Sequence, residues 1–88
     1  MEFRWNEWNL EHATKHGVAV EEVEALIEGM KAPYPEGRGD GKWIVKGRGA
    51  GGRFIQAVYA MDDDGTIFVI HARPLTDAEK RQYLRRRR

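Results

Sequence analysis

Apolar residues near the start of the chain follow two different periods. Residues 2–5 (Glu-Phe-Arg-Trp) alternate one by one, which predicts a short strand. Asn6 is a suitable helix N-cap, and a first helix is expected to end at Gly17, after His16. From Val20 to Gly29 apolar residues recur at helical spacing, which predicts a second, amphipathic helix. Its core-facing residues would be Val20, Val23, Leu26, Ile27 and Met30.

The middle of the chain is predicted to be a loop followed by strands. Residues Pro33–Gly41 (PYPEGRGDG) are too rich in proline and glycine for regular structure, so a loop is expected there. Three β-like runs follow, at Lys42–Lys46, Arg53–Met61 and Thr66–Arg73. The stretches GRGAGG and DDDG between them are short and typical of turns, which predicts antiparallel hairpins.

A last helix is expected to begin at Thr76. Thr76 and Glu79 match the capping box S/T-x-x-E, directly after Pro74, which cannot extend a strand ladder. The predicted order is therefore β-α-α-β-β-β-α, an α+β fold in which helices pack on an antiparallel sheet. With 88 residues we expect one domain, 1–88, in which residues 84–88 form a frayed basic tail.

Composition excludes several classes of protein. The chain has no cysteine, so disulfides and thiolate metal sites are excluded. No apolar run approaches the roughly 20 residues that a membrane span needs, and no signal pattern is visible at the N-terminus. A soluble, cytoplasmic protein without a membrane partner is expected.

Positive charge is concentrated at the end of the chain. Residues 73–88 carry seven basic and two acidic side chains, whereas the chain as a whole has a net charge of only +1. Such a block is typical of a protein that binds a polyanion, most often nucleic acid. A solvated tail that aids solubility is the alternative. The expected RNA-binding residues are Arg53, Lys80, Arg81, Arg85 and Arg86.

The last β-like run carries a histidine and an arginine two positions apart. Strand alternation places Ile67, Val69, His71 and Arg73 on one face. An imidazole that titrates near neutral pH, beside a guanidinium, suits proton transfer next to a phosphate. The alternative is a half-buried histidine and an arginine paired with an acid such as Glu79.

The last helix brings further candidate groups together. Glu79 and Tyr83 are four residues apart on one face, with Lys80 in the same turn. A carboxylate, a phenol and a guanidinium would suffice to cleave RNA through its own 2′-hydroxyl, without a metal. The structural alternative is favoured for Glu79, because a capping box needs a Glu or Gln there. Tyr83 would then pack its ring on the sheet.

Two other patterns do not support a cofactor site. His12 and His16 are four apart, but the stretch HATKH lacks the glutamate of a zinc-protease helix and no third ligand is evident. His16 is expected instead to close the helix beside Gly17. The GRGAGG stretch lacks the Lys-Ser/Thr of a nucleotide-binding loop, so a hairpin tip is expected. We therefore expect neither a metal nor a cofactor.

Both ends of the chain resemble one known family. The segments WNEWNLEHATKHGVAVEEVE and IFVIHARPLTDAEKRQYLRRRR resemble the start and end of BrnT-like toxins of bacterial type II toxin–antitoxin systems. The resemblance covers nearly the whole chain in the same order, although residues 33–52 match only as a loop and a hairpin. It implies a RelE-like α+β fold and ribonuclease toxicity. It also implies a DNA-binding antitoxin that neutralises the toxin, so that operator DNA is reached only through the antitoxin.

The resemblance also singles out residues. His16, Arg73, Glu79 and Tyr83 correspond to recurrent family positions, with Arg73 and Tyr83 the best catalytic candidates. The chain departs from the family at His71, where a small hydroxyl residue is common, and in its tail of four arginines. The expected function is a metal-independent endoribonuclease toxin. The alternatives are a non-catalytic RNA- or partner-binding module, and a protein whose basic face docks an acidic partner.

Overall fold

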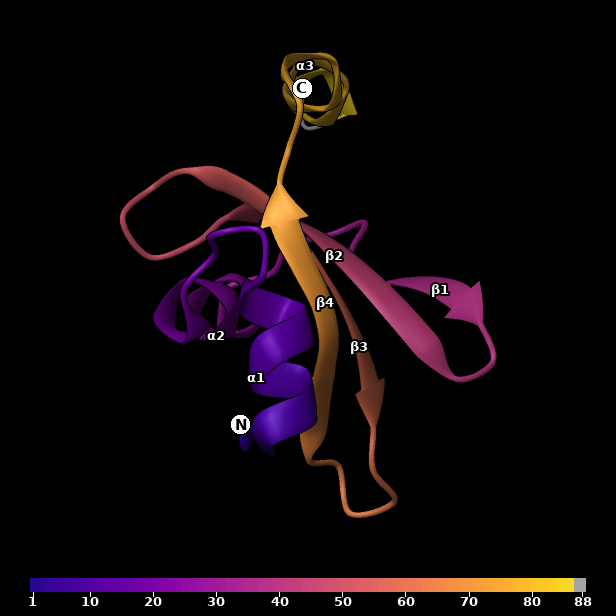
Figure 1. The fold of residues 1–88 in the computed structure, drawn as a ribbon. Coiled ribbons are helices and arrows are strands. Elements are labelled where there is room, and N and C mark those ends of the chain that lie inside the picture. Colours follow the sequence, from indigo (N-terminus) through magenta and orange to yellow (C-terminus); the bar gives the residue numbers. More distant parts are fainter. Residues whose placement is uncertain (87–88) are drawn as a thin grey trace.

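The chain folds as a four-stranded antiparallel sheet with three helices. The computed structural model describes residues 1–86. Its elements are α1 (Glu7–Thr14), α2 (Val20–Glu28), β1 (Glu36–Gly39), β2 (Lys42–Arg48), β3 (Phe54–Met61), β4 (Ile67–Pro74) and α3 (Asp77–Arg86). The strands lie in the order β1-β2-β3-β4, so that every neighbouring pair is a hairpin (Figure 1). The α+β class and the hairpins predicted from the turns are confirmed.

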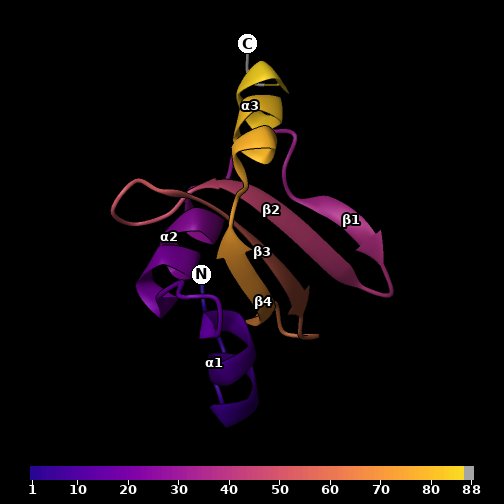
Figure 2. The ribbon, with the colours of Figure 1, turned by 45° about the horizontal axis from the view of Figure 1, so that its top comes forward.

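The helices are distributed unevenly around the sheet. Helix α1 lies along β4, and α2 packs on β2 and β3. Helix α3 stands beyond the end of β4, joined to it by a short extended segment (Figure 2). None of the helices in the described part of the chain is long and apolar enough to cross a membrane.

Helix α1 begins at the predicted cap. The Asn6 side chain accepts a hydrogen bond from the backbone N–H of Asn9 (3.0 Å), and the Asn9 side chain accepts one from the Asn6 N–H (2.6 Å). Asn9 is fully buried, and its amide also donates to the Arg4 carbonyl at 2.9 Å. The helix ends at Thr14, and Gly17 then adopts the left-handed φ of 84° that glycine tolerates best. This turn directs the chain into α2.

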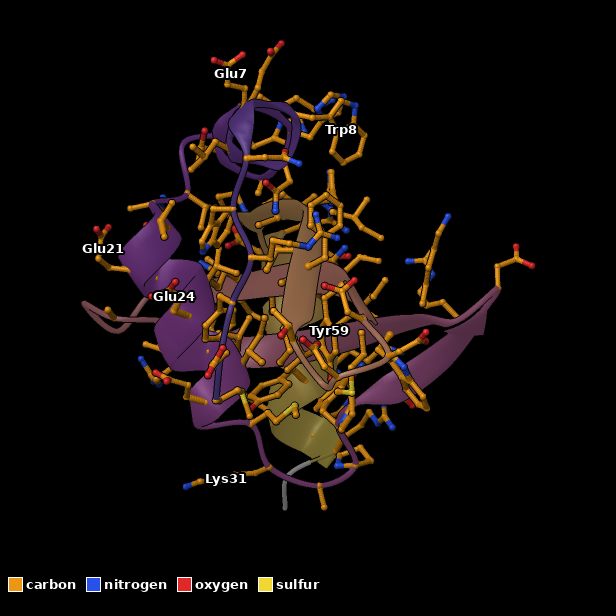
Figure 3. The ribbon with its side chains drawn as sticks, turned by 90° about the horizontal axis from the view of Figure 1, so that it is seen from below. Glu7, Trp8, Glu21, Glu24, Lys31 and Tyr59 are labelled. Atoms are coloured by element: carbon orange, nitrogen blue, oxygen red, sulfur yellow. The ribbon has the colours of Figure 1, made fainter. Side chains whose placement is uncertain are left out.

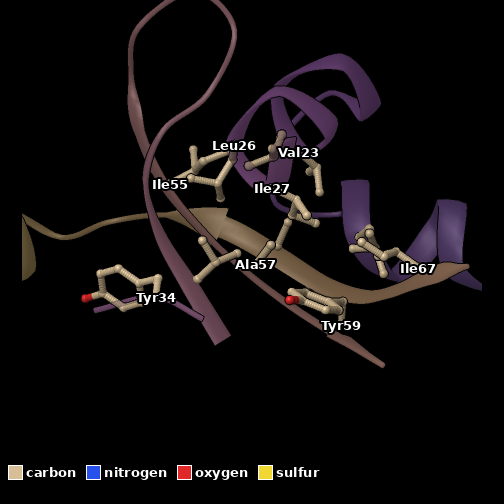
Figure 4. Close-up of a cluster of buried hydrophobic side chains, with 13 residues drawn as sticks. Val23, Leu26, Ile27, Tyr34, Ile55, Ala57, Tyr59 and Ile67 are labelled. Atoms are coloured by element: carbon tan, nitrogen blue, oxygen red, sulfur yellow. The ribbon is translucent and has the colours of Figure 1, made fainter. Parts of the chain in front are cut away.

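One face of α2 supplies much of the core. Val23, Leu26 and Ile27 are buried against Ile55, Ala57 and Tyr59 of β3 and neighbouring apolar side chains (Figure 4). The solvent-exposed side of the helix is acidic, and Glu21 projects away from the sheet (Figure 3). The predicted amphipathic helix is therefore confirmed, and its core face packs on the same side of the sheet as α1.

The loop predicted at Pro33–Gly41 is wrong in its second half. Residues 36–39 form β1, with Glu36 opposite Ile44, and Asp40 and Gly41 adopt left-handed φ values of 54° and 70° in the turn. Three of the four β1 residues are exposed and two are glycines, so no alternating pattern marks the strand. Backbone hydrogen bonds to β2 define this strand instead.

Two predictions at the ends of the chain are corrected as well. Residues 2–5 form only an isolated bridge, in which Arg4 donates to the Ile67 carbonyl at 2.8 Å. The observed order is thus α-α-β-β-β-β-α. Residues 84–86 belong to α3 rather than to a frayed tail, and residues 87–88 lie outside the described range.

Strand β4 does not keep one alternation along its length. His71 pairs with Val58, whereas Val69 pairs with Tyr59, so Ile70 is an extra residue in the ladder. This β-bulge reverses the faces beyond it. Ile67 and Val69 are buried together with Ala72, while His71 and Arg73 lie on the opposite face. The prediction that Ile67, Val69, His71 and Arg73 all share one face is therefore wrong. His71 and Arg73 do share a face, but Ile67 and Val69 lie on the other one.

Candidate nucleic-acid interface

Two histidines from distant parts of the chain meet at the edge of the sheet. The ring of His71 on β4 and the ring of His16, just after α1, have centroids 5.2 Å apart and planes at 67°. His16 is exposed and His71 is half-buried. Packing of α1 along β4 brings the two imidazoles together. The sequence named both residues as candidates but offered no reason to expect contact between them.

The surroundings of His71 favour its neutral form. Burial lowers the pKa of His71 below its ordinary 6.5, and the positive charges of His16, Arg73, Lys15 and Arg38 lower it further. These neighbours come from the segment after α1, from β4 and from β1. Every charged group that acts on this pKa is basic. The result is a neutral proton acceptor in a place that attracts anions.

Arg73 is held by Glu79. Its Nη1 and Nη2 atoms donate to the two carboxylate oxygens at 2.7 Å each, and Nη1 also donates to the Pro74 carbonyl at 3.1 Å. The same carboxylate accepts a hydrogen bond from the Thr76 N–H at 2.8 Å, while the Thr76 hydroxyl accepts one from the Glu79 N–H at 3.2 Å. The predicted capping box is present, and the structure also contains the arginine–carboxylate pair considered as the structural alternative.

These contacts make Glu79 a weak base. The Arg73 guanidinium, followed by the hydrogen bond from Thr76, lowers the pKa of Glu79 to about 2. A carboxylate with such a pKa removes protons poorly at neutral pH, because the best general base has a pKa near the working pH. The arrangement suits a residue that positions Arg73.

The Arg73–Glu79 pair should make stability depend on acid. The pKa of Glu79 falls from 4.5 to about 2 on folding, so its stabilisation is complete above pH 4.5 and is lost as the pH falls towards 2. Glu79→Gln should flatten this part of the curve of unfolding free energy against pH, measured by urea denaturation. Asp77→Asn, in the exposed first turn of the same helix, is the control. Equal slopes for Glu79→Gln and the wild type would contradict the assignment.

Several cations without a salt bridge in the described chain lie on β1 and β2, on the sheet face opposite α1 and α2, and others lie outside the sheet. In residues 1–86, eight Lys and Arg side chains form no salt bridge: Lys15, Lys31, Arg38, Lys42, Lys46, Arg48, Arg81 and Arg85. Strand register places Lys46 beside Gln56, and Gln56 beside Arg73, on this face. Helix α3 reaches the end of this face, where Glu79 pairs with Arg73 and the Tyr83 ring packs against Phe54. Cations without acidic partners leave a positive potential that suits a polyanion.

Three of the five predicted RNA-binding residues have intramolecular partners. Arg53 makes a two-pronged pair with Glu22 (2.7 and 3.0 Å) and donates to the Gly17 carbonyl, which ties β3 to the start of α2. Lys80 lies 3.5 Å from Asp77. The remaining contact joins the end of α3 to β1 through Arg86 and Glu36, at 3.1 Å. Arg81 and Arg85 are exposed on α3.

The sequence analysis did not include the basic residues of β1 and β2 among the RNA-binding residues. Lys42, Ile44, Lys46 and Arg48 are alternate residues of one strand, so the period-two pattern could have placed them on one face. No such signal existed for Arg38, because it lies in the segment predicted to be a loop.

Tyr83 lies in an aromatic cluster. Its ring centroid is 6.1 Å from that of Tyr34, nearly parallel, and 5.7 Å from that of Phe54, edge to face. The residue is half-buried and packs against the core, as the structural alternative expected. Together with Lys46 and Glu79 it also lines a small cleft of about 50 Å³. Tyr83 therefore shares this cleft with Glu79.

His12, the histidine of α1, contacts Trp8 rather than His16 or His71. His12 contacts the Trp8 carbonyl through Nδ1 (2.7 Å), and its ring stacks on the Trp8 indole with centroids 3.9 Å apart. Within residues 1–86, no three His, Asp or Glu side chains are grouped so as to hold a metal ion.

Comparison with known proteins adds no assignment. No protein-family model, curated protein or solved structure matches the chain. The side chains on the sheet face that carries His71 and Arg73 are therefore the basis for a functional proposal.

Proposed function

We propose that the protein is a metal-independent endoribonuclease toxin of a type II toxin–antitoxin system, with a RelE-like fold. The observation that carries the proposal is the contact between His16 and His71, beside Arg73, on a sheet face with unpaired cations. This arrangement combines a neutral base, a second imidazole and a phosphate-binding guanidinium. The nucleophile would be the 2′-hydroxyl of the RNA itself.

The reaction is an in-line transfer of the phosphoryl group. Neutral His71 accepts the proton of the 2′-hydroxyl, and the 2′-oxygen forms a bond to phosphorus while the bond to the 5′-oxygen breaks. A protonated His16 or the phenol of Tyr83 gives a proton to the departing 5′-oxygen. The products are a 2′,3′-cyclic phosphate and a 5′-hydroxyl.

Arg73 would bind the phosphate without leaving Glu79. Glu79 and the Pro74 carbonyl take only part of the N–H groups of a guanidinium, so others can donate to phosphate oxygens. The bidentate pair orients the fork and removes some of the conformational freedom that substrate binding would otherwise cost. Glu79 is thus proposed as a positioning residue.

The toxin–antitoxin assignment rests on the resemblance of both chain ends to BrnT-like toxins and on the α+β fold. Its partners would be RNA as substrate and a cognate antitoxin, with operator DNA bound only through that antitoxin. Residues 87–88 and the basic end of α3 would add non-specific attraction to RNA or to the antitoxin.

A second candidate is a non-catalytic RNA- or partner-binding module. The observation that favours it is that Arg53, Arg73 and Arg86 already have carboxylate partners. Such a module would bind RNA through the unpaired cations, with an affinity that falls steeply as salt rises.

Purified protein should cleave single-stranded RNA in the presence of a chelator and leave 2′,3′-cyclic phosphate ends. A substrate with 2′-deoxyribose at every position should stay intact, because it lacks the nucleophile. Expression should arrest bacterial growth, and co-expression of the neighbouring gene product should relieve the arrest. RNA that is bound but uncut at high protein concentration would favour the non-catalytic module.

A further inference from the structure

A groove of about 360 Å³ lies between the end of α2, strand β2 and helix α3. Its volume is at the low end of small-molecule pockets, which span roughly 300–1,000 Å³. Its apolar side chains are Leu26, Met30, Phe54, Tyr83 and Leu84. The groove is therefore large enough for a flat, partly apolar group.

The rim of the groove is basic. Lys31, Lys46 and Arg48 line it, and none of them forms a salt bridge with the described residues. Lys31 projects beyond the end of α2 (Figure 3). The Arg48 guanidinium lies 4.2 Å from the centroid of the Phe54 ring and also donates to the Gly52 carbonyl. A planar cation on an aromatic ring, among unpaired charges, matches a ligand that joins a flat ring to an anion.

The groove lies close to Arg73 along the sheet. Lys46 lines the groove and is opposite Gln56, which in turn is opposite Arg73. Two strand spacings, roughly 10 Å, therefore separate the groove from the residue proposed to hold the cleaved phosphate. An RNA strand bound at Arg73 would enter the groove with one of its neighbouring nucleotides.

We propose that this groove is a subsite for an unpaired nucleobase that flanks the cleaved bond. The proposal rests on RNA being the substrate. The base stacks at Phe54 and Arg48, while Lys31 and Lys46 neutralise the adjacent phosphates. An acidic peptide would satisfy the charges, but the short distance to Arg73 and the aromatic side chains of the groove favour a nucleotide. The consequence is a preference for certain bases at one position beside the cleavage point.

The test uses short 2′-O-methyl RNA strands, which bind but cannot be cleaved. One base is removed at each position in turn, and affinity is measured by fluorescence anisotropy. Loss of the base at a single position should weaken binding about ten-fold. Phe54→Leu keeps apolar volume but lacks the ring, so it should weaken binding of the intact strand similarly and abolish the effect of the missing base.

Phe68→Leu is the matched control, because Phe68 is also half-buried in the sheet but is covered by Trp8 and Arg4. The affinity of Phe68→Leu for the intact RNA strand, and the effect of removing each base in turn, should equal those of the wild type. Arg48→Gln, at an exposed position, is the second variant if Phe54→Leu does not fold, and should lose affinity several-fold at the same position.

The possible failures are distinguishable. A flat profile with normal RNA cleavage would overturn the subsite and leave the nuclease proposal standing. If removal of one base weakens binding at a single position, and this effect needs Phe54, but natural RNA is not cleaved, the subsite is supported and the nuclease proposal is rejected. Absence of RNA binding, or binding of acidic peptides that RNA does not displace, would overturn the subsite.

Discussion

Replacing His71 with alanine is expected to lower the rate of RNA cleavage by roughly 10²–10⁴-fold, the usual contribution of a general base. The fold should survive, because His71 is half-buried on the face opposite the core and its aromatic contact is with the exposed ring of His16. His12→Ala is the matched control, since His12 stacks on Trp8 away from the site. Cleavage by His71→Ala at the wild-type rate would reject His71 as the base.

The pH profile provides a second readout for His71. A base acts in its neutral form, and the pKa of His71 is lowered, so the acid limb of kcat/KM should lie below pH 6.5. Lys15→Gln and Arg38→Gln each remove a positive charge that lowers this pKa, so each should move the limb upward. His16 and Arg73 also face His71 and are left unchanged in this comparison. A limb unmoved by both substitutions would contradict the electrostatic account.

Arg73→Ala is expected to abolish growth arrest and to lower cleavage at least 10²-fold, because the developing charge on the phosphate loses its guanidinium. Arg73→Lys should not restore activity, since lysine cannot reproduce the two-pronged contact with Glu79. Arg4→Ala, which removes an exposed arginine paired in the same two-pronged way with Asp62, is the control. Thermal unfolding of each variant separates loss of activity from loss of the fold.

Glu79→Gln distinguishes positioning from proton transfer. The amide can still accept hydrogen bonds from Thr76 and Arg73, so a positioning role predicts that cleavage falls by no more than about ten-fold. If Glu79 were a general base, Glu79→Gln would instead lower cleavage as much as Arg73→Ala does.

Persistent growth arrest by Arg73→Ala, with the fold intact, would contradict the assignment of Arg73 to the site.

Much of the local structure could be predicted from the sequence. The Asn6 cap, the amphipathic face of α2 and the Thr76–Glu79 capping box depend on residues within one or two helical turns. The hairpins depend on short glycine- and aspartate-rich turns. These interactions are local, so the sequence pattern contains them completely.

Strand β1 and the bulge at Ile70 could not be predicted in the same way. The β1 strand has little apolar pattern and forms because β2 offers it backbone hydrogen-bonding groups. The bulge arises from pairing with β3 and moves His71 and Arg73 to the face opposite Val69. Both features depend on partner strands.

The sequence by itself determined most of the elements and the residues capable of chemistry: His16, His71, Arg73, Glu79 and Tyr83. Only the tertiary structure decided which of them meet. It brought His16 into contact with His71, paired Arg73 with Glu79, and placed Tyr83 among aromatic rings. The physical reason is the separation along the chain of the residues that interact. Caps, turns and alternation involve neighbours in the chain, whereas these contacts depend on how helices and strands pack against one another.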